Sequence, residues 1–227
     1  MPILALDTAG ENCAVAVAKT GNSLSVLARR TEAVGRGHAE RLMPMIGEVL
    51  AEADLAYADL ERIAVTTGPG SFTGTRIGVA VARGLALALA VPAVGVSVLD
   101  ALIETAEADG LVAAALDARR GEIYAKAVRA GGTIALEAQV TTAADLAQAI
   151  AGLDGGPVTL TGSAAADVAR ILGKAGIVAT IGGEAATADI STVAALGASA
   201  DSVEPPVPLY LRPPDAKPQT GMAVARK

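Results

Sequence analysis

Histidine, cysteine and aromatic residues are scarce in this chain of 227 residues. It contains one histidine, one cysteine, one phenylalanine, three tyrosines and no tryptophan. A single histidine excludes a metal site built from two or more imidazole ligands, and a single cysteine excludes an intramolecular disulfide. Four aromatic side chains are too few for a surface that stacks a series of unpaired bases.

Basic residues and long apolar runs are also few. The 18 basic residues stand against 24 acidic ones, a net charge of −6, so we expect weak nucleic-acid binding by the chain alone. The longest uncharged stretch, residues 84–99, contains Pro92 and Gly95 and is shorter than the roughly 20 apolar residues that cross a bilayer. We interpret it as a buried helix followed by a buried strand. No basic region precedes an apolar run at the start, so we expect a cytoplasmic protein without membrane contact.

The order of periodic segments predicts an α/β protein with a duplicated βββαβα unit. The first unit is expected to have strands at 2–7, 13–19, 24–30, 63–67 and 93–96, and helices at 38–53, 75–90 and up to about 108. The second is expected to have strands at 111–117, 122–129, 133–140 and 158–161, and helices at 143–150 and 165–172. Residue identities repeat as well, because Ala5-Leu6-Asp7 is echoed by Ala115-Leu116-Asp117.

This pattern divides the chain into units at 1–108 and 109–204 and a tail at 205–227. The tail contains six of the 11 prolines and therefore cannot form a helix or a central strand. Either it is a loosely attached end, or it is an extended segment docked through Leu209, Tyr210 and Leu211.

A glycine-rich loop joins a predicted strand to a predicted helix at residues 68–78. Its amides and the helix N-terminus could bind an anion, although the loop lacks the lysine of a P-loop. The alternative is that its glycines serve a tight turn and close packing. This loop could be a vestigial nucleotide- or anion-binding loop. Its candidate residues are Asp7, Thr8, Gly68, Gly70, Ser71, Thr73 and Gly74.

The helix after this loop is apolar nearly all round. Small residues form one ridge through Gly78, Ala82 and Ala86, and Arg76 and Arg83 are its only charges. Such a helix is expected to be buried on every side, by its own chain or by a partner helix. Leaving its leucine and valine side chains in water would cost about 1.5–3 kcal/mol each.

Three further residues have plain alternatives to a chemical role. Asp7 ends the first strand, where a carboxylate could hold a metal-bound nucleotide or could form a turn. His38 begins a helix and lacks a second histidine four residues on, which favours a structural or interface role. Cys13 is interpreted as a small core residue.

Several segments resemble the bacterial TsaB family. They are Leu6-Asp7-Thr8, Gly37-His38-Ala39-Glu40-Arg41-Leu42-Met43-Pro44, the loop at 68–78, Ala82-Arg83-Gly84-Leu85-Ala86 and Tyr210-Leu211-Arg212. The resemblance implies the fold of the actin, sugar-kinase and heat-shock chaperone superfamily, with two βββαβα units and mixed sheets. Thr75 and Ala9 depart from the family pattern and argue against claiming a nucleotide site.

The resemblance also implies a role in placing threonylcarbamoyl on N6 of the adenosine next to the anticodon, in tRNAs that read codons beginning with A. Family members are non-catalytic partners of TsaD, which transfers the group and holds a metal, and of the ATPase TsaE. The positions that match the metal-binding histidines of TsaD are Val98 and Leu102 here, so we expect no metal, no bound cofactor and no ATPase or peptidase activity in this chain alone.

The apolar face of the two helices suggests the surface that pairs with TsaD, or with a second copy when TsaD is absent. The predicted contact residues are Ala39, Leu42, Met43, Ile46, Leu50, Gly78, Ala82 and Ala86. Contact with tRNA is expected only through the complex. The competing hypothesis is a small-molecule kinase or ATPase of the same superfamily that uses Asp7 and the glycine loop; a metallopeptidase is disfavoured by the single histidine.

Overall fold

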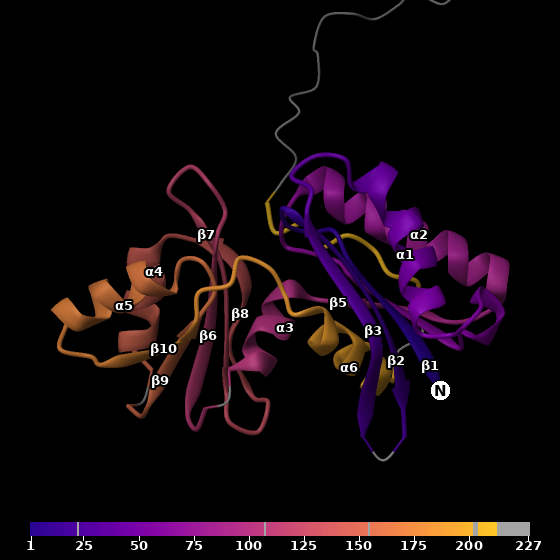
Figure 1. The fold of residues 1–227 in the computed structure, drawn as a ribbon. Coiled ribbons are helices and arrows are strands. Elements are labelled where there is room, and N and C mark those ends of the chain that lie inside the picture. The colour runs from indigo at the N-terminus through magenta and orange to yellow at the C-terminus, as the bar shows by residue number, and fades with distance from the viewer. Residues whose placement is uncertain (22, 107, 154, 202–203, 213–227) are drawn as a thin grey trace, which may run out of the picture.

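The computed structural model describes residues 1–212, apart from 22, 107, 154 and 202–203. Two five-stranded mixed sheets form two lobes, with helices on both faces of the first sheet (Figure 1). The first half contains β1 (Pro2–Asp7), β2 (Asn12–Thr20), β3 (Leu24–Ala33), α1 (His38–Glu52), η1 (Tyr57–Asp59), β4 (Arg62–Thr66), α2 (Phe72–Leu89), β5 (Ala93–Val96) and α3 (Val98–Thr105). The second half contains β6 (Leu111–Asp117), β7 (Ile123–Arg129), β8 (Ile134–Thr141), α4 (Ala143–Ala151), β9 (Val158–Thr161), α5 (Ala165–Lys174), β10 (Ala179–Gly183) and α6 (Ile190–Ser199).

The two sheets have the same topology. Their orders are β3-β2-β1-β4-β5 and β8-β7-β6-β9-β10, each with two antiparallel pairs followed by two parallel ones. This confirms the duplicated unit predicted from the sequence. Strand β10 and helix α6, which complete the second copy, were not predicted from the sequence.

Residue alternation in the first sheet separates two cores. Leu4 and Leu6 of β1 point to the face that α1 and α2 cover, whereas Ile3 and Ala5 point to the face that α6 covers. Small residues bring α6 unusually close to the sheet: a Cβ on Gly197 would lie 2.3 Å from the Cβ of Ala64. Part of the alanine and glycine content therefore serves this close approach.

The two halves exchange helices, which corrects the predicted division at 108/109. Helix α3 lies in the first half of the sequence but packs on β6 and β7, and α6 lies in the second half but packs on β1, β2 and β4. Both helices lie between the two sheets in Figure 1. The lobes therefore share one core, because each supplies a helix to the other sheet.

The proline-rich segment is docked over residues 204–212, as the second interpretation predicted. Leu209 N donates to the carbonyl of Thr67 at 2.7 Å, and Leu211 packs against the shared core. Arg212 pairs with Glu122 of the second lobe and donates to the carbonyl of Ala118. The segment thus connects the lobes; the remainder of the predicted tail, 213–227, lies outside the described residues.

Candidate functional site

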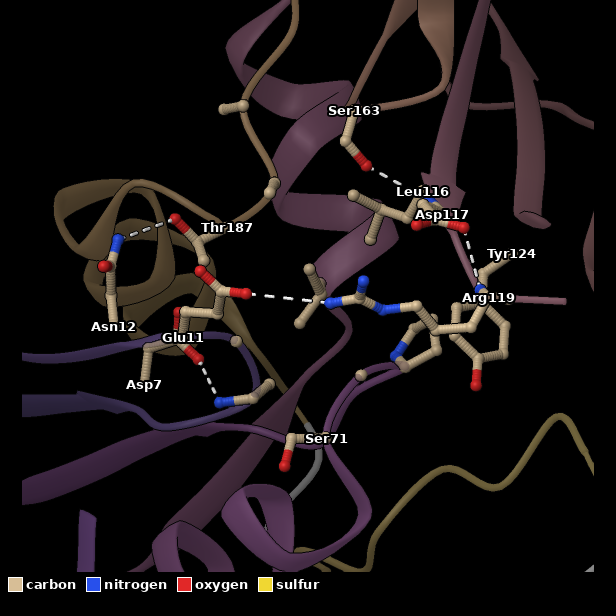
Figure 2. A pocket seen from close by; sticks show the side chains of 18 of the residues that line it. Asp7, Glu11, Asn12, Ser71, Leu116, Asp117, Arg119, Tyr124, Ser163 and Thr187 are labelled. Carbon is tan, nitrogen blue, oxygen red and sulfur yellow. Dashed lines mark hydrogen bonds and ion pairs between the residues drawn. The ribbon is translucent and has the colours of Figure 1, made fainter. Parts of the chain in front are cut away.

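A cleft of about 680 Å³ lies between the lobes, where β1 and β6 end. Each strand ends in an aspartate, Asp7 and Asp117, and both line the cleft (Figure 2). Across its mouth, the guanidinium of Arg119 lies 3.7 Å from the carboxylate of Glu11, and both side chains are well exposed. The duplication therefore brings its two aspartates to the same cavity.

The carboxylate of Asp7 is buried, and one of its oxygens is bonded by neighbouring residues. Its Oδ1 accepts hydrogen bonds from Ala9 N at 2.9 Å and from the hydroxyl of Thr66 at 2.6 Å. The side chain is 1 % exposed, and burial raises the pKa of Asp7 above its usual value, although these two hydrogen bonds oppose the shift.

Asp117 has the same local geometry in the second lobe. Its Oδ1 accepts from Arg119 N at 2.8 Å, while its own amide donates to the hydroxyl of Ser163 at 3.0 Å. Both aspartates thus bond the amide two residues on, the arrangement by which aspartate forms turns. The turn-forming interpretation of Asp7 accounts for this geometry.

The glycine loop packs tightly against the turn after β1. A Cβ on Gly74 would lie 2.0 Å from the carbonyl oxygen of Thr8, and one on Gly78 would lie 2.5 Å from its hydroxyl. Thr8 Oγ1 donates to the carbonyl of Gly74 at 2.7 Å, and Ser71 N donates to the carbonyl of Ala9 at 2.6 Å. These glycines let α2 approach β1, as the packing alternative proposed.

In some folds a carboxylate at the end of such a strand holds a metal-bound nucleotide. Here Oδ1 of Asp7 is bonded by Ala9 and Thr66, and the glycine loop packs against the turn after β1. No group of three histidine, cysteine, aspartate or glutamate side chains that could hold a metal occurs among the residues described.

His38 and Cys13 belong to the interior. The Nε2 of His38 lies 3.2 Å from the carbonyl oxygen of Asn12, and its side chain is buried at the start of α1. Cys13 is fully buried in the core under α1 and α2, where burial raises the pKa of its thiol to about 11. Both positions agree with the structural roles predicted for them.

Most residues of the predicted partner surface are buried within this chain and therefore not accessible to a partner. The residues of that set that lie inside the chain's own core are Leu42, Ile46, Leu50, Gly78 and Ala82. Ala39 and Met43 are exposed and Ala86 is half-buried. The apolar periodicity identified the face that covers the sheet, so only these three predicted residues remain accessible to a partner.

The described chain covers only one face of α2, so burial on every side would need the partner helix that the prediction allowed. The inner face of α2 packs on β4 and α1, but Ala80, Gly84 and Leu87 face outward, and Leu87 is 85 % exposed. By length and hydropathy alone α2 is also apolar enough to cross a membrane, a test that core helices pass as well. An outward apolar helix face therefore remains uncovered by the described residues.

An exposed aromatic and arginine cluster lies at the start of α2, and the sequence pattern alone does not predict it. The guanidinium of Arg76 lies 3.7 Å from the ring centroid of Phe72, and its Nε donates to the hydroxyl of Tyr210 at 2.6 Å. The two rings are 5.3 Å apart. Both occur in the segments that resemble TsaB, but 138 residues separate them in the sequence, and only the docked segment brings them together.

Comparison with solved structures defines the class of protein by its fold, a two-lobed α/β architecture that is also found in a sugar kinase. The ROK hexokinase from Thermus thermophilus matches with a TM-score of 0.54 and 15% identity over 87% of this chain and 99% of that one, which shows the fold alone. YeaZ from Pseudomonas aeruginosa matches with a TM-score of 0.74 and 29% identity over 92% of this chain and 99% of that one.

Sequence comparison identifies the family. The family described as "TsaD: tRNA N6-adenosine threonylcarbamoyltransferase" matches residues 29–171. The tRNA threonylcarbamoyladenosine biosynthesis protein TsaB of Escherichia coli is 41% identical over 55% of this chain and 53% of its own length. An uncharacterized protein of Mycobacterium bovis, Mb3455c, is 37% identical over 95% of this chain and 94% of its own. Together these matches show that the chain belongs to the bacterial TsaB proteins, within the TsaD family.

The alignments to curated TsaB proteins span about half of those proteins. Val98 and Leu102, which stand at the positions expected for metal-binding histidines in TsaD, both lie in α3 and are 2 % exposed in the shared core. Their apolar side chains pack α3 between the lobes.

Proposed function

We propose that this chain is a non-catalytic subunit in the biosynthesis of threonylcarbamoyladenosine on N6 of the adenosine next to the anticodon, in tRNAs that read codons beginning with A. It acts by dimerising with the catalytic paralogue TsaD and by recruiting the ATPase TsaE. Support comes from the names of its TsaB relatives and from the match to the TsaD family. The observation that carries the partner role is the uncovered outer face of α2, with Leu87 85 % exposed.

The non-catalytic role is supported by the chemistry of the cleft. The Asp7 carboxylate is buried and bonded to Thr66 and Ala9, and the TsaD-type histidine positions are the buried Val98 and Leu102. ATP and the metal then belong to the partner subunits, and this chain binds no cofactor alone. Catalysis of threonylcarbamoyl transfer accordingly takes place in TsaD.

The proposed contact surface combines the exposed members of the predicted set with the outer face of α2. Met43, 41 % exposed, and Ala39 lie on the outer side of α1, and Ala86 lies at the edge of α2. The same surface would serve a homodimer when TsaD is absent. The net charge of −6 supports tRNA contact only through the complex, and the tRNA-modification role supports a cytoplasmic location without membrane contact.

Depletion of the gene tests the proposed function directly. We expect threonylcarbamoyladenosine to disappear from the tRNA nucleosides measured by mass spectrometry, and to return when the wild-type gene is restored. Normal levels after depletion would contradict the proposal. Nucleotide titration of the purified chain by calorimetry tests the alternative, because tight ATP binding with turnover of a small substrate would favour a kinase.

A further inference from the structure

The outer face of α2 is an apolar stripe that contains two arginines. This α2 stripe consists of the exposed residues Thr73, Arg76, Ala80, Arg83, Gly84 and Leu87. Arg76 and Arg83 are seven residues apart, so they lie on the same side of the helix, two turns from each other. At the far end, Leu87 and Arg83 line a shallow groove with Pro205 and Pro206 of the docked segment.

Packing within the described part of this chain gives no reason for a glycine at position 84. It lies inside the helix, where glycine is among the least favourable residues, and its backbone has an ordinary helical conformation. A Cβ at this position would meet nothing within 4 Å, in contrast to Gly78 on the inner face. A residue without a side chain at an exposed helix position leaves room for the close approach of a second backbone.

Arg76 and Arg83 make the stripe positive on an acidic protein. They are the only charged residues of α2, and neither forms an ion pair with any residue in the described part of the chain. Contacts with Phe72 and Tyr210 hold the guanidinium of Arg76 in place. A fixed cation loses little side-chain freedom when it pairs with a carboxylate.

We propose that the α2 stripe docks an apolar helix that carries acidic residues on a different chain, and that Arg76 and Arg83 select this partner over a second copy. The inference rests on the proposed function, with TsaD as the different chain. In a two-fold homodimer that pairs the stripes, an axis near Ala80 brings Arg76 beside Arg83 of the second copy. An axis near Gly84 brings the two copies of Arg83 together, so either arrangement sets like charges against each other.

The acidic residues of α1 offer little compensation in a second copy. Glu48 is already bonded to Arg30 and Arg41, and Glu52 lies 3.6 Å from Arg30. An acidic helix on another chain meets no such competition. A protein helix is favoured over RNA as the occupant because the stripe also contains Ala80, Gly84 and the exposed Leu87. An RNA backbone is bound through its phosphates and would gain nothing from these apolar positions.

The test compares two associations of the full chain at low and high salt. The variants are Arg83→Gln, Arg83→Lys and the double variant Arg76→Gln/Arg83→Gln, with Arg170→Gln on α5 as a matched exposed control. Affinity for TsaD of the same organism is measured by calorimetry, and self-association by sedimentation equilibrium, at about 50 mM and about 500 mM NaCl. Circular dichroism melts check that every variant folds.

We expect each arginine removed to weaken TsaD binding about fivefold at low salt and much less at high salt. Arg83→Lys and Arg170→Gln should bind as wild type does. Self-association should change in the opposite sense: salt should strengthen it in the wild type, and the double variant should associate more tightly.

Unchanged TsaD affinity in the double variant, or weaker self-association, would overturn the inference. So would a loss of tRNA binding by the double variant while its TsaD affinity stays normal. Failure of the wild type to bind TsaD at any salt concentration would contradict the proposed function instead, and the self-association measurements would still decide what the arginines do.

Discussion

The hydroxyl of Thr66 donates a 2.6 Å hydrogen bond to the buried carboxylate of Asp7, and so joins the ends of the neighbouring parallel strands β1 and β4. The same oxygen, Oδ1, accepts the amide of Ala9. Two donors to one oxygen mean that an asparagine could keep both bonds through its own Oδ1. An asparagine substitution can therefore remove the charge of Asp7 and keep its two hydrogen bonds.

We predict that Asp7→Asn raises the melting temperature at pH 7. Burial raises the pKa of Asp7, so the folded state holds its proton to a higher pH than the unfolded state does. Stability therefore falls as the pH rises from the unfolded pKa of about 3.9 through the folded pKa, and the ionised form is the costly one. The gain should vanish near pH 3.5. Thermal melts of variant and wild type at several pH values measure this gain. If the variant melts below wild type at pH 7 and does not do so at pH 3.5, the raised pKa of Asp7 is contradicted.

A pair of glycine substitutions on α2 should have opposite effects on stability. Gly78→Ala places a Cβ 2.5 Å from the hydroxyl of Thr8 and should cost about 1–3 kcal/mol of unfolding free energy. Gly84→Ala adds a methyl group in open space and should gain about 0.5–1 kcal/mol in the isolated chain. Urea unfolding of both variants measures the difference. A destabilised Gly84→Ala would show that the outer face of α2 is packed within this chain.

Leu42 and Met43 are neighbours in α1, but Leu42 lies in the core and Met43 lies at the surface. Leu42→Ala should lower the unfolding free energy by about 2–5 kcal/mol, because Leu42 is fully buried. Met43→Ala, at a position 41 % exposed, should change it by less than about 0.5 kcal/mol. If the proposed contact surface is right, Met43→Ala weakens TsaD binding without lowering the melting temperature. Equal losses of stability in both variants would contradict the burial pattern.

Arg41 should stabilise the chain at neutral pH but not in acid. It donates to both carboxylate oxygens of Glu32 at 2.6 Å and to those of Glu48 at 2.8 and 2.7 Å, which links β3 to α1. These bonds lower the pKa of both glutamates. Their contribution is present above the unfolded glutamate pKa and disappears as the pH falls through the folded values. Arg41→Gln should therefore melt earlier than wild type at pH 7 and like wild type at pH 2, with Arg170→Gln as the control.

Cys13 should resist thiol reagents in the folded protein. Its side chain is fully buried and burial raises its pKa to about 11, so the reactive thiolate is rare at pH 8. We expect Ellman's reagent to label it fully in denaturant and negligibly without. Rapid labelling of the folded chain at a rate independent of denaturant would contradict the placement of β2 in the core.

The sequence determined the duplicated α/β unit and most of its elements, because alternation and helical periodicity follow directly from burial on one face. The Ala5-Leu6-Asp7 and Ala115-Leu116-Asp117 repeats end equivalent strands, as their identity indicated. Residue type and spacing also identified the glycine loop. The absence of TsaD-type histidines at Val98 and Leu102 is what the resemblance to the TsaB family implies.

Tertiary structure decided which apolar residues are accessible. Periodicity cannot distinguish a face that covers its own sheet from a face that binds a partner. It therefore predicts a contact surface that includes Leu42 and Leu50, although both residues form the core. Packing also set α3 and α6 on each other's sheets, and it brought Tyr210 to Arg76 across 134 residues. Such contacts depend on how separate segments share one hydrophobic core, which the order of residues along the chain does not express.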